Sequence, residues 1–282
     1  MLNPFVTPER KLRNGWWIVI FFLLLAALVV PATIHASSHE GKVAVTWQAL
    51  MVLAVTWGCV ALRRESLAEV VGPPKSYPRG ILVGIALGVA IWSVTAVVLW
   101  GTGAVTWKLS ADAVSALQTG LGEGMAIAIV EELLFRGFVF RRLVDGLGAW
   151  PAQLLMAAYF VLNHWNNPGM TGPTQAIAAT NIFLASLLFG TLYLRTRSLA
   201  LPIALHFALN FTQGNLLGFG VSGHDSPGLL TPTLHTAPVW WTGGAFGLEA
   251  SVPGTLIIAG VFVAALMWKR TQNTSPTLAV AR

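Results

Sequence analysis

Three ionisable residues lie close together inside an apolar stretch of this sequence, at Glu131, Glu132 and Arg136. The stretch, about residues 119–143, is otherwise apolar enough to cross a bilayer, where charged side chains are expensive and usually functional. In a helix, Glu132 and Arg136 lie one turn apart on one face with the acid first, which favours an ion pair. Glu131 points about 100° away from that face. We therefore interpret Glu132 and Arg136 as a structural pair and Glu131 as the working carboxylate. The alternative is that all three charges only lock helices together.

Two other apolar stretches carry polar residues at the same one-turn spacing. Phe160 shares a helix face with His164, and His206 shares one with Asn210. The helical rise places Glu131, His164, His206 and Asn210 roughly 10–20 Å along their segments. Three helices are therefore expected to converge on one cavity near the middle of the membrane.

These residue types suit the activation of a water molecule. A buried carboxylate such as Glu131 can act as a general base. His164 could orient the water or pass a proton to a leaving amine, while His206 and Asn210 could donate to a developing oxyanion. No serine or cysteine nucleophile stands at a recognisable spacing from a base. Each polar residue also has a structural alternative as a hydrogen bond between helices.

Three other functions remain open for the same residues. Glu131, His164 and His206 could bind a catalytic zinc ion, although the HExxH spacing is absent. We therefore expect no cofactor, with zinc as the alternative. A non-enzymatic membrane scaffold or immunity protein is the second possibility. A proton-coupled transporter is the third, but no inverted repeat is evident.

Composition identifies an integral membrane protein. Of the 282 residues, 55% are hydrophobic and 10% are charged, whereas soluble domains carry about 25% charged residues. We expect one all-α polytopic domain over residues 1–282 with about eight transmembrane helices of about 20 residues each. The expected spans are 16–36, 43–63, 80–100, 119–143, 150–166, 175–195, 199–219 and 252–268. Residues 101–118 are expected to form a linker with a short interfacial helix at about 111–118. Residues 220–250 form a loop, and a basic tail follows the last span.

The basic residues predict the orientation. With both termini in the cytoplasm, fourteen lysines and arginines lie inside, only Lys42 and Lys108 lie outside, and Arg136 lies within a span. This distribution favours a bacterial inner membrane and argues against nucleic-acid binding, despite the net charge of +6. Cys59 is the single cysteine, so no intrachain disulfide can form.

Three motifs resemble those of a known family: EELLFRG at 131–137, FVLNH at 160–164 and HFALN at 206–210. The family is the CAAX prenyl endopeptidases of the Ras-converting type with their bacterial relatives, the CAAX protease and bacteriocin-processing (Abi) proteins. The resemblance covers about residues 115–215, and every motif position matches. It implies an eight-helix intramembrane glutamate-dependent endopeptidase acting on a membrane-associated peptide or protein, with lipidated substrates as one class. The implied roles are a catalytic base at Glu131, a supporting pair at Glu132 and Arg136, water activation at His164, and an oxyanion site at His206 and Asn210.

The stretch GGAFGLEAS at 243–251 is similar to one that precedes the last helix in the bacterial relatives. It contains Glu249. We interpret Glu249 as an acid at a helix N-terminus that satisfies backbone amides, with a catalytic role as the alternative.

Overall fold

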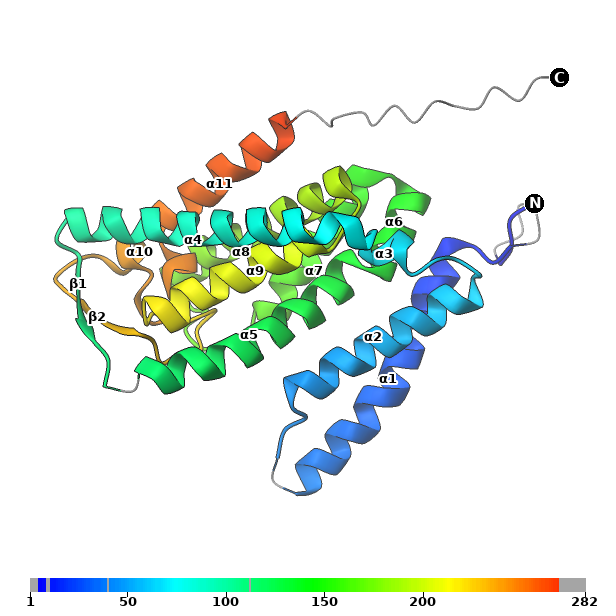
Figure 1. Cartoon of the computed structure of the whole chain (residues 1–282), viewed down its shortest axis with the longest axis horizontal. Coiled ribbons are helices and arrows are strands. Elements are labelled where there is room, and N and C mark those ends of the chain that lie inside the picture. Colours follow the sequence, from blue (N-terminus) through cyan, green and yellow to red (C-terminus); the bar gives the residue numbers. More distant parts are fainter. Residues whose placement is uncertain (1–4, 9–10, 40, 112, 269–282) are drawn as a thin grey trace.

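The computed structural model describes residues 5–8, 11–39, 41–111 and 113–268, which form a bundle of helices (Figure 1). The predicted basic tail after residue 268 lies outside the described residues. The longer helices are α1 (Asn14–Ser38), α2 (Val45–Leu62), α4 (Tyr77–Gly101), α5 (Ala113–Arg136), α6 (Phe138–Leu147), α7 (Ala149–His164), α8 (Gly172–Thr196), α9 (Ala200–Asn210) and α11 (Val252–Met267). The short elements are α3 (Ala68–Val71), α10 (Val239–Thr242), a π-helix at Phe211–Leu216, and 3₁₀ turns at Pro74–Ser76, Gly244–Phe246 and Leu248–Ala250.

The prediction of an all-α polytopic membrane protein is confirmed. Within the described residues, five stretches are long and apolar enough to cross a membrane: 14–38, 45–62, 68–101, 113–147 and 172–196. The helices α7 and α11 are 16 residues long and α9 is 11 residues long, so each is shorter than a typical span. The number of eight spans therefore stays a prediction.

Small residues bring α4 and α9 into close contact. A Cβ atom built at Gly84 would lie 2.7 Å from the Cβ of Ala204, and one at Gly88 would lie 2.6 Å from that of Ala208. This spacing of four residues on both helices is the small-residue packing that membrane helices use, because apolar burial alone does not drive their association in lipid. The contact fixes α9, and with it His206, against the rest of the bundle.

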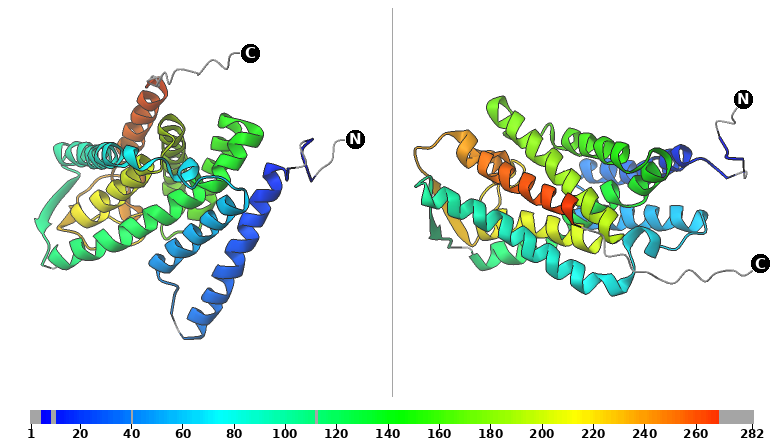
Figure 2. Two further views of the ribbon diagram at one scale, coloured as in Figure 1. Left: turned by 45° about the vertical axis from the view of Figure 1, so that its right-hand side comes forward. Right: turned by 90° about the horizontal axis from the view of Figure 1, so that it is seen from above.

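The remaining helices flank this pair. As Figure 2 shows, α1 and α2 form a hairpin on one side of the bundle. There α2 packs against α5 and α1 packs against α6. On the other side, α11 packs against α8 and α4. The segments that carry the predicted site, α5, α7 and α9, therefore lie between these flanking helices.

Two predicted spans end early. The expected helix at 119–143 is interrupted at Gly137, where a Cβ would overlap the carbonyl oxygen of Leu133, and α6 starts afresh at Phe138. The expected helix at 199–219 changes after Asn210 into the π-helix, a wider turn that often occurs at functional sites. Hydropathy follows polarity and does not report these changes in backbone geometry.

The linkers also contain structure that the sequence analysis missed. Residues 105–109 of the predicted linker form strand β1 (Val105–Leu109), and the short helix expected at about 111–118 is the first part of α5, which begins at Ala113. Strand β1 pairs antiparallel with β2 (Leu230–Leu234), with Val105 opposite Leu234. The predicted loop at 220–250 thus holds one strand of a two-stranded ribbon. Val105, Thr106 and the aromatic Trp107 favour strand in β1, but the partner strand is more than 100 residues away.

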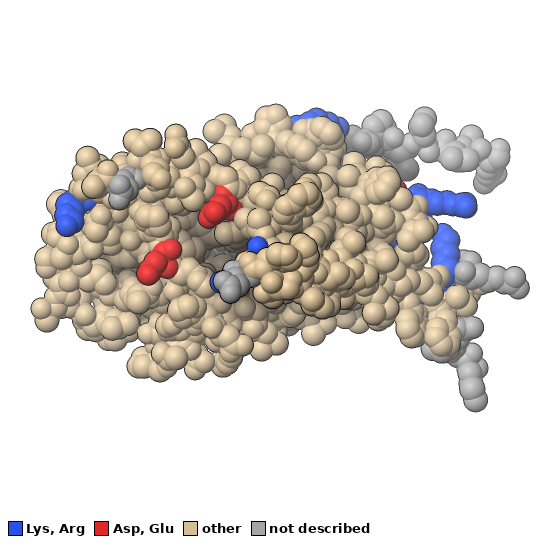
Figure 3. Space-filling model, turned by 90° about the horizontal axis from the view of Figure 1, so that it is seen from below, with Lys and Arg blue, Asp and Glu red and all other residues tan. Residues whose placement is uncertain are grey.

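The opposite end of the bundle is joined by polar contacts. The guanidinium of Arg142 pairs with Glu65 at 3.1 Å, and Arg141 pairs with Glu69 of α3. Arg195, at the end of α8, donates to the carbonyl of Leu266 in α11 at 2.8 Å. Figure 3 shows a largely uncharged face, with most of the visible basic side chains toward one end and acidic side chains beside a central hollow. Such a distribution fits a protein that is surrounded by lipid along its middle.

Candidate active site

The predicted pair Glu132–Arg136 is present and buried. The Arg136 Nη1 atom donates to Glu132 Oε1 at 3.0 Å, and the two side chains are 0% and 1% exposed. Nη2 of the same guanidinium donates to the carbonyl oxygen of Ser186 at 3.1 Å and to its hydroxyl at 2.6 Å. The guanidinium also lies 4.8 Å from the ring centroid of Phe160. These contacts neutralise Glu132 and join α5 to α7 and α8.

His206 extends this cluster toward a cavity. Its Nδ1 atom lies 2.8 Å from Glu132 Oε1. A carboxylate only accepts hydrogen bonds, so Nδ1 carries the hydrogen and the neutral ring has its lone pair on Nε2. The ring stacks on Phe189, with centroids 5.1 Å apart and planes at 10°. The orientation of the His206 ring is therefore fixed by two contacts: the hydrogen bond from Nδ1 to the Glu132 carboxylate and the packing of the ring on Phe189.

Glu131 differs from its neighbour. Its side chain is 26% exposed, and its Oε2 atom lies 3.7 Å from His206 Nε2. That distance is too long for a direct hydrogen bond, and Oε2 is enclosed without any hydrogen-bond partner among the described residues. A water molecule or a substrate group between the two atoms could bond to both. Glu131 is thus placed to receive a proton, whereas Glu132 Oε1 already accepts two hydrogen bonds.

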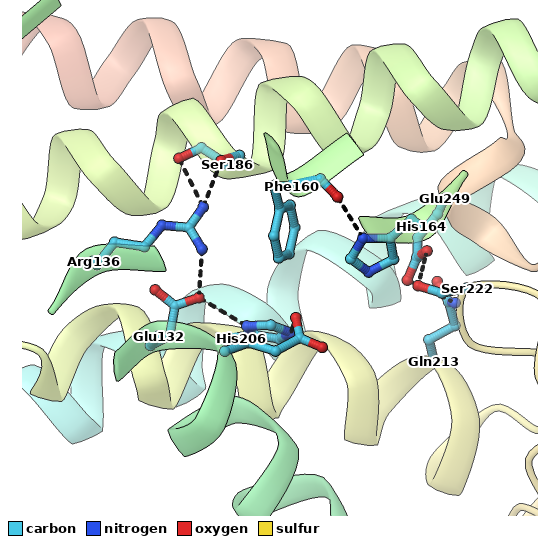
Figure 4. Close-up of polar contacts among 10 residues, drawn as sticks. Glu132, Arg136, Phe160, His164, Ser186, His206, Gln213, Ser222 and Glu249 are labelled. Carbon is cyan, nitrogen blue, oxygen red and sulfur yellow. Dashed lines mark hydrogen bonds and ion pairs between the residues drawn. The ribbon is translucent and has the colours of Figure 1, made fainter. Parts of the chain in front are cut away.

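His164 lies at the end of α7, with its ring on a small polar cavity. Its Nδ1 atom is 2.7 Å from the carbonyl oxygen of Phe160 (Figure 4). A carbonyl can only accept, so Nδ1 again carries the hydrogen, and Nε2 is the free nitrogen. The cavity has a volume of about 40 Å³, and about 10–15 Å³ measured in the same way is enough to hold one water molecule. It is therefore large enough for a reacting water and a neighbour.

Residues from five helices, one loop and one 3₁₀ turn line this cavity: Trp92, Phe160, His164, Asn181, Ile182, Ala185, Phe189, His206, Leu209, Asn210, Ser222, Glu249 and Ile258. Three of the predicted site residues, His164, His206 and Asn210, are among them. Glu131 is not, and it reaches the cavity only through the His206 ring. Two of the three helices predicted to converge, α7 and α9, thus line the cavity, whereas α5 contributes no described lining residue and Glu131 lies at the rim beside His206.

Asn210 lies one turn after His206 on α9 and is half-buried. No hydrogen bond from its side-chain amide to the described residues is found. Its donor is thus free for a ligand in the cavity, on the same side as His206 Nε2. Both groups can face one substrate oxygen, which is what an oxyanion site requires.

The sequence analysis was wrong about the structural role of Glu249. The cap of α11 is Ser251, whose hydroxyl accepts from the backbone amide of Gly254 at 3.1 Å. Glu249 instead accepts from the Ser222 hydroxyl at 2.7 Å and from the Gln213 side-chain amide at 3.3 Å, and it lines the cavity. Ser222 and Gln213 were missed altogether. The available signal for this second polar cluster was an acid in a loop free of lysine and arginine, where the other acid is Asp225.

A metal site is not evident among the described residues. No group of three or more histidine, cysteine, aspartate or glutamate side chains there is arranged to hold an ion. Glu131, His164 and His206, the three predicted alternative ligands, are spread between the rim and the interior of the cavity. Zinc stays an alternative that experiment can test.

Comparison with known proteins supports the resemblance seen in the motifs. The family model described as type II CAAX prenyl endopeptidase Rce1-like matches residues 113–212, about a third of the chain. The matched segment extends from the start of α5 to just past Asn210, so it includes all six predicted site residues. No curated protein and no solved structure shows significant similarity to the chain.

Proposed function

We propose that this chain is an intramembrane endopeptidase that depends on Glu131. The premise is the match of residues 113–212 to the Rce1-like family of type II CAAX prenyl endopeptidases. The family is one of proteases, and the helices around the matched segment are apolar enough to lie in a membrane. One observation carries the assignment of Glu131. Its side chain is 26% exposed, and its Oε2 atom faces His206 Nε2 without a hydrogen-bond partner among the described residues. Glu132 Oε2 also lacks a partner there, but Glu132 is fully buried and its Oε1 atom is in an ion pair with Arg136.

The proposed reaction is hydrolysis of a peptide bond by water. Glu131 removes one proton from the water as its oxygen forms a bond to the carbonyl carbon. His206 and Asn210 stabilise the negative charge that develops on the carbonyl oxygen. The carbon–nitrogen bond then breaks, and the leaving amine takes up a proton. His206 can donate from Nε2 only when its ring is protonated, and the two carboxylates beside it, Glu131 and Glu132, favour that charge.

Glu132 and Arg136 act indirectly in this proposal. Glu132 fixes the tautomer and the angle of His206, as a buried carboxylate does in a hydrolase triad. Arg136 balances the charge of Glu132 and ties it to Ser186 on α8. Neither side chain needs to touch the substrate.

The proposed substrate is a membrane-associated peptide or protein, and lipidated substrates are the first class to assay because the family is named for them. We place both termini in the cytoplasm of a bacterium, with the chain in the inner membrane, because fourteen of the seventeen basic residues then lie inside. The described basic residues at the ends of α2, α6 and α8 lie at one end of the bundle, consistent with this topology.

The test is a peptidase assay of the purified chain in lipid nanodiscs. Wild type, Glu131→Ala and the surface control Glu69→Gln are incubated with a library of proteome-derived peptides, including prenylated and acylated ones. We expect cleavage by wild type and by Glu69→Gln and none by Glu131→Ala. Equal cleavage by Glu131→Ala would overturn the assignment. Bound stoichiometric zinc, together with complete loss of activity on chelation, would replace the glutamate mechanism with a zinc-dependent one.

A further inference from the structure

Glu249 is a second carboxylate at the cavity, and the proposed reaction does not use it. It lies in the 3₁₀ turn Leu248–Ala250, directly before α11. Both of its oxygens are held by side chains: Oε2 accepts from the Ser222 hydroxyl at 2.7 Å, and Oε1 accepts from the Gln213 amide at 3.3 Å. Two donors that converge on one carboxylate fix its position and support its charged form.

The donors are themselves held in place. Gln213 is fully buried in the π-helix, and its amide also donates to the carbonyl of Gly220 at 2.7 Å. Ser222 has a left-handed backbone, with φ of 48°, which is uncommon for a residue other than glycine and clusters at functional sites. The side chain of Asn167, just beyond α7, donates to the Ser222 carbonyl at 3.0 Å.

Glycine allows the two loops to meet at this point. Gly247 has φ of +100°, and a Cβ there would overlap the carbonyl oxygen of Gly220. Glu249 lies two residues after Gly247. The loop that carries Ser222 and the turn that carries Glu249 are therefore packed backbone against backbone. Such close packing is unnecessary for a solvated surface acid and holds Glu249 toward the cavity.

Glu249 and His164 line the same cavity and interact through their charges. Figure 4 shows the Glu249 carboxylate on the side of the His164 ring away from the Phe160 carbonyl. The pKa of Glu249 is raised from its ordinary value, because burial outweighs the Ser222 hydrogen bond and the positive charge on His164 or His206, which lower it. The other ionisable groups near these residues are on α5: Glu131 faces His206 Nε2 from the rim, and Glu132, paired with Arg136, contacts His206 Nδ1.

We propose that Glu249 is a positioning residue for His164, and that the two form a carboxylate–imidazole pair that delivers the proton to the leaving amine. In a serine hydrolase triad one carboxylate both fixes the tautomer of the histidine and stabilises its positive charge. Here the Phe160 carbonyl and Glu249 have one of these roles each. The Phe160 carbonyl fixes the tautomer of His164 through Nδ1, and Glu249 stabilises the positive charge of the protonated ring. This inference rests on the proposed peptidase function.

Every proton released in this step is taken up by a named group. Glu131 takes one proton from the attacking water as the new carbon–oxygen bond forms. As the carbon–nitrogen bond breaks, the Nε2–H bond of protonated His164 breaks too, and its proton forms the N–H bond of the product amine. The proton held by Glu131 then returns through water in the cavity to His164, and both groups are ready for the next turnover.

The experiment compares two substrates that differ in their need for this proton. One is the peptide that wild type cleaves best, and the other is the same peptide with a thioester at the cleaved bond. A thiol has a pKa of about 8.5, so a thiolate leaves without being protonated, whereas an amine does not. Turnover of both is measured for wild type, Glu249→Gln, Glu249→Asp, Ser222→Ala, His164→Ala, the double variant His164→Ala with Glu249→Gln, Glu131→Gln, and the matched control Glu69→Gln.

We expect Glu249→Gln to lower kcat on the amide by about 10²-fold, within the range of general acid catalysis, with KM little changed. The loss on the thioester should be less than about threefold. Glu249→Asp, which keeps the charge, should recover part of the amide activity, and Ser222→Ala should show a smaller loss of the same kind. In the His164→Ala background, Glu249→Gln should have no further effect on the amide, because the two act as one unit.

The outcomes separate the two proposals. Equal losses on amide and thioester, or a full additional loss in the His164→Ala background, would overturn the role of Glu249 and leave the peptidase intact. Full amide activity of Glu249→Gln would do the same. If Glu131→Gln cleaves both substrates as wild type does, the proposed function itself fails. If Glu249→Gln does not fold, Ser222→Ala with both substrates still decides the question.

Discussion

The two nitrogens of His206 face regions of opposite character. On the Nδ1 side, Glu132, Arg136 and Ser186 are buried and bonded to one another. On the Nε2 side, the Glu131 Oε2 atom has no hydrogen-bond partner among the described residues, and the ring borders a cavity with several polar walls. In the first region Glu132 Oε1, Arg136 and Ser186 bond to one another and so hold helices together, although Glu132 Oε2 is buried without a partner among the described residues. The second keeps bonding capacity free, which a substrate and a water can use.

Arg136→Met tests the first region and should have the largest effect on stability. It leaves the buried Glu132 charge without its partner, which costs about 3–5 kcal/mol. We expect a corresponding fall in the free energy of unfolding, measured by titration with sodium dodecyl sulfate in mixed micelles. The double variant Glu132→Gln with Arg136→Met is the control. It should recover part of the loss, and failure to do so would show that charge pairing is not what Arg136 contributes.

Asn210→Ala tests the second region. Removing one donor to a developing oxyanion lowers kcat by about 10²–10³-fold, while the free energy of unfolding should change little, because the Asn210 amide makes no hydrogen bond to the described residues. Turnover and unfolding are measured on the same preparation. A large loss of stability with unchanged kcat would place Asn210 among the structural residues.

Gly88→Ala tests whether α9 needs close contact with α4. The new Cβ would lie 2.6 Å from that of Ala208, and overpacking of this kind costs about 1–3 kcal/mol. Gly58, on α2, has open space at its Cβ position and serves as the matched control. Thermal unfolding should show Gly88→Ala below wild type and Gly58→Ala at or above it. Equal behaviour of the two variants would contradict the packing account.

Glu69→Gln should have the smallest effect. Its partner Arg141 and Glu69 itself are 21% and 45% exposed, and surface ion pairs contribute about 0–1 kcal/mol. Turnover should equal that of wild type, as the assays above require of this control. A change in kcat would mean that the basic end of the bundle is coupled to the cavity.

The sequence predicted the parts of the site that depend on helical spacing. Glu132 with Arg136, and His206 with Asn210, are one turn apart, and an α-helix places such residues on one face regardless of the surrounding fold. Apolar composition likewise predicted the membrane-spanning helices. These features are local, so a single sequence is sufficient to find them.

What the sequence analysis missed depends on tertiary structure or on backbone geometry. The pairing of β1 with β2 joins segments more than 100 residues apart. The break at Gly137 and the π-helix after Asn210 change the backbone without changing the hydropathy. Glu249 precedes a helix and so resembles a capping acid, and only the approach of Ser222 and Gln213 from other segments gives it a different set of partners.

The comparison of Glu131 with Glu132 is tested most directly by the turnover of Glu131→Gln, measured with its free energy of unfolding. Glutamine has the shape of glutamate but does not accept a proton from water. We expect kcat to fall by about 10²–10⁴-fold while the free energy of unfolding stays within about 0.5 kcal/mol of wild type. Turnover within about tenfold of wild type, in a variant that is as stable, would contradict the assignment of Glu131 as the base that activates the water.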